Sequence, residues 1–173
     1  AYFSEFAFLR DRVRLELDFL SALSKTGIFR PLTISESTRL ESIKSNFSST
    51  DAGSIRAHER ETRHDVKAIE YFLQAELQGT SLRDLLPWIH FGLTSEDVNN
   101  IAQGIALRDS RDLIFLPALD ALINSLREFV KQTRAFPMLA RTHGQFAVPT
   151  TLGKEFAVYI ARLKAARDAI AAH

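Results

Sequence analysis

Three of the five histidines lie among small polar or charged residues that suit proton transfer and anion binding. The first of these motifs centres on His143, which stands between Thr142 and Gly144, with Arg141 and Gln145 on either side. Imidazole titrates near neutral pH, so a polar loop can present it as a general acid or base. The glycine permits close backbone approach, and the arginine offers a fork for a carboxylate or phosphate. The structural alternative is a polar crossover between helices, in which His143 bonds a backbone carbonyl.

A second motif, Arg63-His64-Asp65, precedes Lys67 and Glu70 at spacings that place them on one helix. Basic groups one turn apart repel each other and cost stability unless acidic neighbours or a bound anion relieve them. We therefore expect an anion site here, with a solvated charged helix face as the alternative.

The third motif begins at His90 and continues through Thr94-Ser95-Glu96-Asp97. Threonine and serine are good N-caps, so helix initiation alone could explain the motif. The same free amides and hydroxyls, at the positive end of a helix dipole, can hold a carboxylate or phosphate oxygen. In that case Glu96 and Asp97 must point away from the anion.

A metal site is not expected. His64, His90 and His143 have neither a cysteine nor a histidine partner one helical turn away, so they lack the spacing of zinc ligands. Glycine-rich phosphate loops and nucleophile elbows are absent from the sequence, and no cofactor is predicted.

The composition excludes several function classes. Basic and acidic side chains number 22 and 21, which gives a net charge of +1 and no field that favours nucleic acid or an anionic membrane. There is no cysteine, and no apolar run approaches the roughly 20 residues that span a bilayer. The cytoplasm is therefore the default location.

Hydrophobic periodicity predicts helices along the first half of the chain. Apolar residues three or four apart predict a helix over 6–23, and Thr33-Ile34-Ser35-Glu36 is typical of a capping box that opens a short helix. The polar stretch 45–54 suggests a loop or hinge, and 55–77 is again helical in period.

The second half predicts a long helix from about residue 94 to 135, kinked at Pro117 and buried on more than one side. The His143 motif would follow as a loop, and a last amphipathic helix would begin near Leu152. No alternating strand pattern or hairpin dipeptide is evident. We therefore predict an all-α fold, with a small N-terminal helical domain over 1–92 and the start of a long-helix bundle over 93–173. Both ends suggest a piece of a longer protein.

At three segments the sequence resembles the fumarase/aspartase superfamily and, within it, the adenylosuccinate lyases of the bacterial type. The matching segments are Thr62 to Leu73, His90 to Asn100 and Arg141 to Glu155. The Thr94-Ser95-Glu96-Asp97 form is specific, because fumarases and argininosuccinate lyases carry different residues at this helix start.

The resemblance implies β-elimination of fumarate from adenylosuccinate and from the related succinyl-carboxamide ribotide of purine synthesis. His143 matches the general acid that protonates the departing nitrogen. Arg63, His64 and Asp65 match a segment that contacts substrate, where the family often has Asn or Arg at the first position. Thr94 and Ser95 match the pair that holds a substrate anion, and Thr142 flanks the acid.

The resemblance also implies a homotetramer whose active sites are each built from three subunits. An N-terminal Arg-Tyr pair and a mobile loop with the general-base serine would lie outside residues 1–173, so this chain alone is expected to be inactive. The alternatives are another superfamily member, such as a carboxymuconate cycloisomerase-like protein, and a non-catalytic helical interaction domain.

Overall fold

The computed structural model describes residues 2–172, and most of them are helical. Two compact units divide the chain, residues 1–107 and residues 108–173. The predicted all-α fold is confirmed, because the only addition to the helices in the described chain is one two-stranded sheet. The predicted domain boundary between residues 92 and 93 stays a prediction, since compact units within a chain need not coincide with the domains of a fold.

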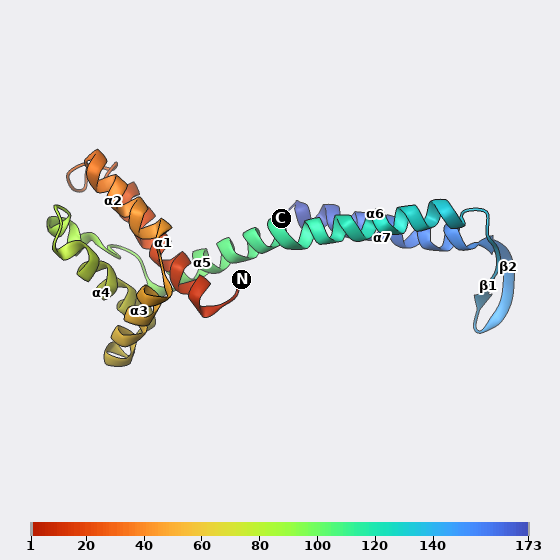
Figure 1. Cartoon of the computed structure of the whole chain (residues 1–173), viewed down its shortest axis with the longest axis horizontal. Helices are drawn as coiled ribbons and strands as arrows, with labels where there is room; N and C mark the ends of the chain where they lie inside the picture. The colour runs from red at the N-terminus through yellow and green to blue at the C-terminus, as the bar shows by residue number, and fades with distance from the viewer. Residues whose placement is uncertain (1, 173) are drawn as a thin grey trace. The chain divides into compact units, whose positions relative to one another are not determined.

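The first unit is built from helices that follow one another closely (Figure 1). Its elements are α1 (Glu5–Leu23), α2 (Ile34–Ser45), α3 (Ser49–Thr62), α4 (Asp65–Gln78), the 3₁₀ helix η1 (Arg83–Trp88) and α5 (Ser95–Ser110), which ends just past the unit boundary.

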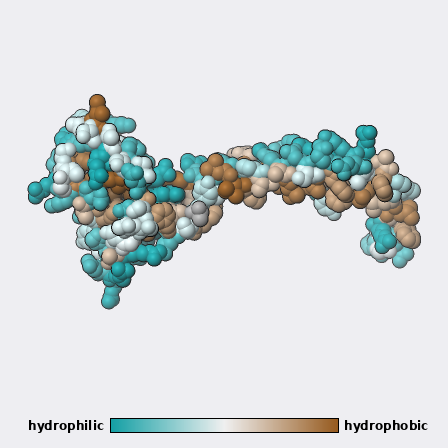
Figure 2. All heavy atoms as spheres, viewed as in Figure 1, coloured by the Kyte–Doolittle hydropathy of each residue, from teal (hydrophilic) through white to brown (hydrophobic). Residues whose placement is uncertain are grey.

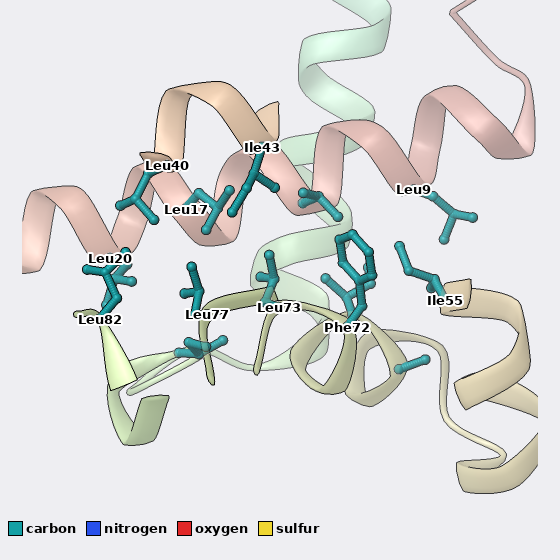
Figure 3. Close-up of a cluster of buried hydrophobic side chains, with 14 of the residues drawn as sticks. Leu9, Leu17, Leu20, Leu40, Ile43, Ile55, Phe72, Leu73, Leu77 and Leu82 are labelled. Atoms are coloured by element: carbon teal, nitrogen blue, oxygen red, sulfur yellow. The ribbon is translucent and has the colours of Figure 1, made fainter. Parts of the chain in front are cut away.

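One hydrophobic core joins α1, α2, α3, α4 and η1 of the first unit. The apolar faces of α1, α2, α3 and α4 point toward one another, with Leu17, Ile55 and Leu73 buried among them (Figure 3). Helix α1 confirms the predicted helix over 6–23. The apolar residues whose spacing predicted it, Leu9, Val13, Leu17 and Leu20, all belong to this core.

The predicted capping box at the start of α2 is present. The Thr33 hydroxyl accepts from the amide of Glu36, and the Glu36 carboxylate accepts from the amide of Thr33. Glu36 is buried and also accepts two hydrogen bonds of 2.8 Å from the guanidinium of Arg30, which in turn holds Asp84 of η1. This capping residue therefore also ties the start of α2 to η1.

Two predictions for the first unit are wrong. The stretch 45–54 is a loop only over 46–48, because Ser48 and Asp51 form a second capping box and α3 begins at Ser49. The predicted single helix over 55–77 is two helices, since Arg63 takes a left-handed backbone conformation (φ 52°) that ends α3, and His64 caps α4. The expected repulsion between Arg63 and Lys67 on one continuous helix therefore does not apply.

The second unit pairs two long helices and a hairpin (Figure 1). Its elements are the π-helical turn η2 (Arg111–Phe115), α6 (Leu116–Thr133), β1 (Pro137–Thr142), β2 (Gln145–Thr151) and α7 (Leu152–Ala171). A wider π turn lies just before Pro117, and the predicted kink there stays a prediction. Proline lacks an amide and its ring crowds the carbonyl four residues earlier, and a π turn relieves this conflict.

Helices α6 and α7 lie side by side, and Arg167 of α7 makes two hydrogen bonds of 3.0 Å to Asp120 of α6. Within residues 2–172 helix α6 is covered on the side of Ile123, which is buried, whereas Leu122 is 49% exposed, so burial on more than one side stays a prediction. Hydrophobic residues gather along one side of this helix pair and hydrophilic residues along the other (Figure 2).

The expectation of no strand is wrong for 137–151, where β1 and β2 form an antiparallel hairpin. Its two-residue turn consists of His143 and Gly144, both with positive φ (52° and 75°). Two residues with positive φ match the twist of the flanking strands, so this turn favours a hairpin over a loop.

We predict that the ionised carboxylate of Glu36 stabilises the fold. Its hydrogen bonds with Arg30 lower its pKa from 4.5 to about 2, so the contribution is complete above about pH 5 and is lost as the pH falls toward 2. Glu36→Gln, which can keep the capping box, should lower the free energy of unfolding at pH 7 by about 2 kcal/mol. Urea unfolding between pH 7 and pH 3 tests this; a difference from wild type that does not shrink in acid would contradict it.

Gly153 lets α7 approach α6 closely, and we predict that a methyl group there is not tolerated. A Cβ at this position would lie 2.7 Å from the Cα of Arg134 and 2.9 Å from the carbonyl oxygen of Val130, both backbone atoms. Gly153→Ala should therefore cost about 1–3 kcal/mol of stability. Gly104→Ala is the control, because its Cβ would meet nothing within 4 Å in mid-helix and should add roughly 0.5–1 kcal/mol. Equal melting temperatures for the two variants would refute this account.

Candidate functional site

The residues predicted to form the site fall into two groups. Arg63, His64, Asp65, Thr94 and Ser95 belong to the first unit, and Thr142 and His143 belong to the second. The structure brings the five residues of the first group to the starts of two helices, α4 and α5.

His64 is the N-cap of α4, and its ring is held in a defined orientation. Its Nδ1 accepts a 3.2 Å hydrogen bond from the amide of Lys67, so the proton of the neutral ring sits on Nε2. About half of the side chain, 52%, remains exposed. His64 can therefore present Nε2 as a donor to a ligand.

Asp65, the first residue of α4, is paired with Arg12 of α1 at 2.7 Å. Partial burial raises the pKa of Asp65, but the charge of Arg12 and the amide of Val66 outweigh this, and the pKa lies below its usual value. Asp65 is therefore an ionised acceptor at neutral pH.

The basic groups near Arg63 are partly neutralised by acidic neighbours. Lys67 donates a 2.7 Å hydrogen bond to Glu70, and Arg56 pairs with Glu5. Arg63 itself is exposed at the end of α3. The anion site at this position stays a prediction, since acidic side chains already reduce the repulsion between the basic groups that a bound anion would otherwise reduce.

At the start of α5, Asp97 does not point away as an anion site would require. Its Oδ2 accepts hydrogen bonds from the Thr94 amide at 2.7 Å and from the Thr94 hydroxyl at 2.8 Å. These two bonds lower the pKa of Asp97. Ser95 makes no side-chain hydrogen bond within residues 2–172, so its hydroxyl is better placed than that of Thr94 to meet a ligand.

His143 and Thr142 occupy the tip of the hairpin in the second unit. Thr142 pairs with Gln145, and His143 follows it in the left-handed conformation of the turn. Both side chains are exposed, and the guanidinium of Arg141 lies 5.5 Å from the centre of the Phe146 ring. The side chain of His143 is therefore accessible at the hairpin tip.

Two charged residues of α1, which sequence reasoning missed, contact these motifs. The Nη2 atom of Arg12 donates to both Asp65 and Asn99, and Glu16 lies 2.6 Å from Nδ1 of His90. Both α1 residues are buried, and burial raises the pKa of Glu16 although the hydrogen bond and charge of His90 oppose this. The sequence offers no clear signal for them, because charged residues beside the apolar stripe of an amphipathic helix are common.

An apolar hollow of about 520 Å³ lies elsewhere in the first unit. Phe3, Phe8 and Ala106 are among the residues that line it, and none of the predicted site residues does. No group of three or more candidate metal ligands was found among residues 2–172, and no helix of the described chain is both long and apolar enough to cross a bilayer.

The sequence matches known lyases over most of its length. The pattern of the lyase family covers residues 34–172. Adenylosuccinate lyase of Dictyostelium discoideum is 40% identical over 94% of this chain and 36% of its own length. That of Haemophilus influenzae is 39% identical over 95% and 37%. The chain thus spans little more than a third of the curated relatives that it matches.

Solved structures show the same fold. A fumarate lyase from Mesorhizobium sp. BNC1 matches 98% of this chain and 38% of its own with a TM-score of 0.80 at 21% identity. A β-carboxy-cis,cis-muconate cycloisomerase from Acinetobacter calcoaceticus gives the same coverage, TM-score and identity. The chain therefore belongs to the lyase family and carries the all-α fold of the fumarase/aspartase superfamily.

Proposed function

We propose that the complete protein containing this chain is an adenylosuccinate lyase. It releases fumarate from adenylosuccinate to give AMP, and acts likewise on the succinyl-aminoimidazole-carboxamide ribotide of purine biosynthesis. The observation that carries this proposal is the match at about 40% identity over 94% of the chain. The lyase-family match over residues 34–172 includes all three histidine motifs. The likeness to the cycloisomerase is at 21% identity and concerns the fold alone.

The reaction is a β-elimination, and residues of this chain meet two of its requirements: stabilisation of the negative charge that develops and protonation of the leaving nitrogen. A base removes a proton from the carbon beside a carboxylate, the carbon–nitrogen bond breaks, and the electron pair forms the double bond of fumarate. The aci-carboxylate that forms on the way carries extra negative charge, which fixed donors such as Ser95 and Nε2 of His64 stabilise. The departing nitrogen needs a proton, and His143 supplies it.

The remaining parts of the site come from outside residues 1–173. The general-base serine belongs to a loop of the complete protein, and for that reason we propose that this chain alone has no turnover. His143 is exposed at the hairpin tip, whereas catalytic groups work best where water is excluded. Further chain segments must therefore cover it in the active enzyme.

A homotetramer in the cytoplasm is part of the proposal. The second unit exposes large apolar side chains that its two helices and hairpin leave uncovered, among them Leu122, Phe129, Phe146 and Tyr159. Exposed apolar surface of this kind marks interfaces with other segments or subunits. Assembly of long helices from several copies would bury it.

The first test is fumarate release from adenylosuccinate by the complete polypeptide. We expect turnover without an added cofactor, followed by the rise in absorbance of fumarate or by chromatography of AMP. If the folded tetramer releases none but converts carboxymuconate, the cycloisomerase alternative holds. A folded protein that is inactive on both substrates would favour a non-catalytic interaction domain.

We predict that His143→Asn in the complete protein keeps the fold and lowers kcat by about 10²- to 10⁴-fold, the usual effect of losing a general acid. Asparagine tolerates the left-handed turn, so the hairpin should survive. His58→Asn is the control, because His58 lies in mid-α3 outside the three motifs. Circular dichroism and steady-state kinetics test both variants; wild-type kcat in His143→Asn would eliminate its proposed role.

A further inference from the structure

Arg12 connects the two helix starts that carry the candidate site in the first unit. Its side chain is 6% exposed, and its Nη2 atom donates to Oδ2 of Asp65 at 2.7 Å and to Oδ1 of Asn99 at 2.6 Å. Asp65 opens α4 directly after His64, and Asn99 lies in the second turn of α5, one turn after Ser95. One nitrogen atom therefore bridges two elements that carry different motifs.

The geometry of this bridge is well defined. The guanidinium carbon lies 3.9 Å from the centre of the Phe8 ring, so the plane of the group is held from within α1. The Asn99 amide is also oriented, because its Nδ2 donates to Glu96 at 3.0 Å. A planar guanidinium fixes the direction of its hydrogen bonds as well as their length, which an ammonium does not.

Stability alone is a weak reason for a buried arginine at this position. Removing a charge from water is costly, and apolar residues of similar size often stabilise a fold as well as a buried ion pair does. The Nε atom of Arg12 is also buried without a protein partner among the described residues, and such unmade hydrogen bonds are costly. The arrangement is better explained by what Arg12 positions than by what it stabilises.

We propose that Arg12 is a positioning residue of the lyase site, which holds the His64-Asp65 motif at a fixed spacing from the Thr94-Ser95 motif before substrate arrives. This inference rests on the proposed function. Arg12 acts through Asp65 and Asn99, so it sets the distance between the groups that would grip the substrate. Misplacement of such groups by about 1 Å can cost about 100-fold in rate.

The test compares variants of the complete polypeptide in fumarate release from adenylosuccinate. Arg12→Lys keeps a positive charge but loses the planar guanidinium that directs Nη2 at both partners; we expect a folded protein with a melting temperature near that of wild type and kcat/KM lower by about 100-fold. Asn99→Ala should lower kcat/KM by a smaller factor. The double variant should lose no more than Arg12→Lys alone, because both changes break the same bridge.

Arg30→Met is the matched control. Arg30 is another arginine of the first unit that holds several partners, Glu36 and Asp84 among them, but none in the three motifs. This variant should melt at a lower temperature and keep the wild-type kcat/KM below its melting transition. A purely structural role for Arg12 would give the same pattern in Arg12→Lys.

The outcomes separate the inference from the proposed function. If wild type turns over and Arg12→Lys keeps wild-type kcat/KM, or loses it only in step with its melting temperature, the inference is overturned while the function stands. Multiplicative losses in the double variant would also overturn it, since they mean that Arg12 and Asn99 act separately. A wild-type protein without turnover would overturn both.

Discussion

Charges that are buried must find partners, and this constraint organises the first unit. Helix α1 places Asp11, Arg12 and Glu16 in the interior beside its apolar stripe. An ion in a medium of low dielectric constant is tolerated only when it is paired or hydrogen-bonded. Asp11 pairs with Arg10 of the same helix, whereas Arg12 and Glu16 find partners at the start of α4, in the first turns of α5 and at His90. Helix α1 therefore connects segments of the first unit that carry the candidate motifs.

The ends of the helices serve two purposes that compete. A helix start needs its free amides satisfied, and a side chain such as that of Asp97 or His64 can do so. The same amides are what an anionic ligand would bind. At α5 the protein's own carboxylate occupies the position, whereas at α4 the cap uses only one nitrogen of an imidazole and leaves the other available. The two helix starts are therefore not equivalent as binding surfaces.

Local patterns were readable from the sequence, and contacts between distant residues were not. The first helix and the capping box at Thr33 depend on neighbours within one turn, and both were predicted. The equivalent box at Ser48 was obscured by the surrounding serines, which resemble a loop. Arg12 finds its partners 53 and 87 residues away, so no spacing rule could name them. The seven predicted site residues can be located in the structure, but their roles stay predictions.

The position of His143 at the hairpin tip depends on the lengths of strands β1 and β2 and not on packing of its side chain. The strands pair from Thr142 with Gln145 to Arg141 with Phe146, and a bulge shifts the register by one residue before Leu139 pairs with Pro149. Adding or deleting one residue in either strand would send alternate side chains to the opposite face of the ribbon. Exposed residues of this segment should therefore be easier to exchange than the number of residues between the bulge and the tip is to change.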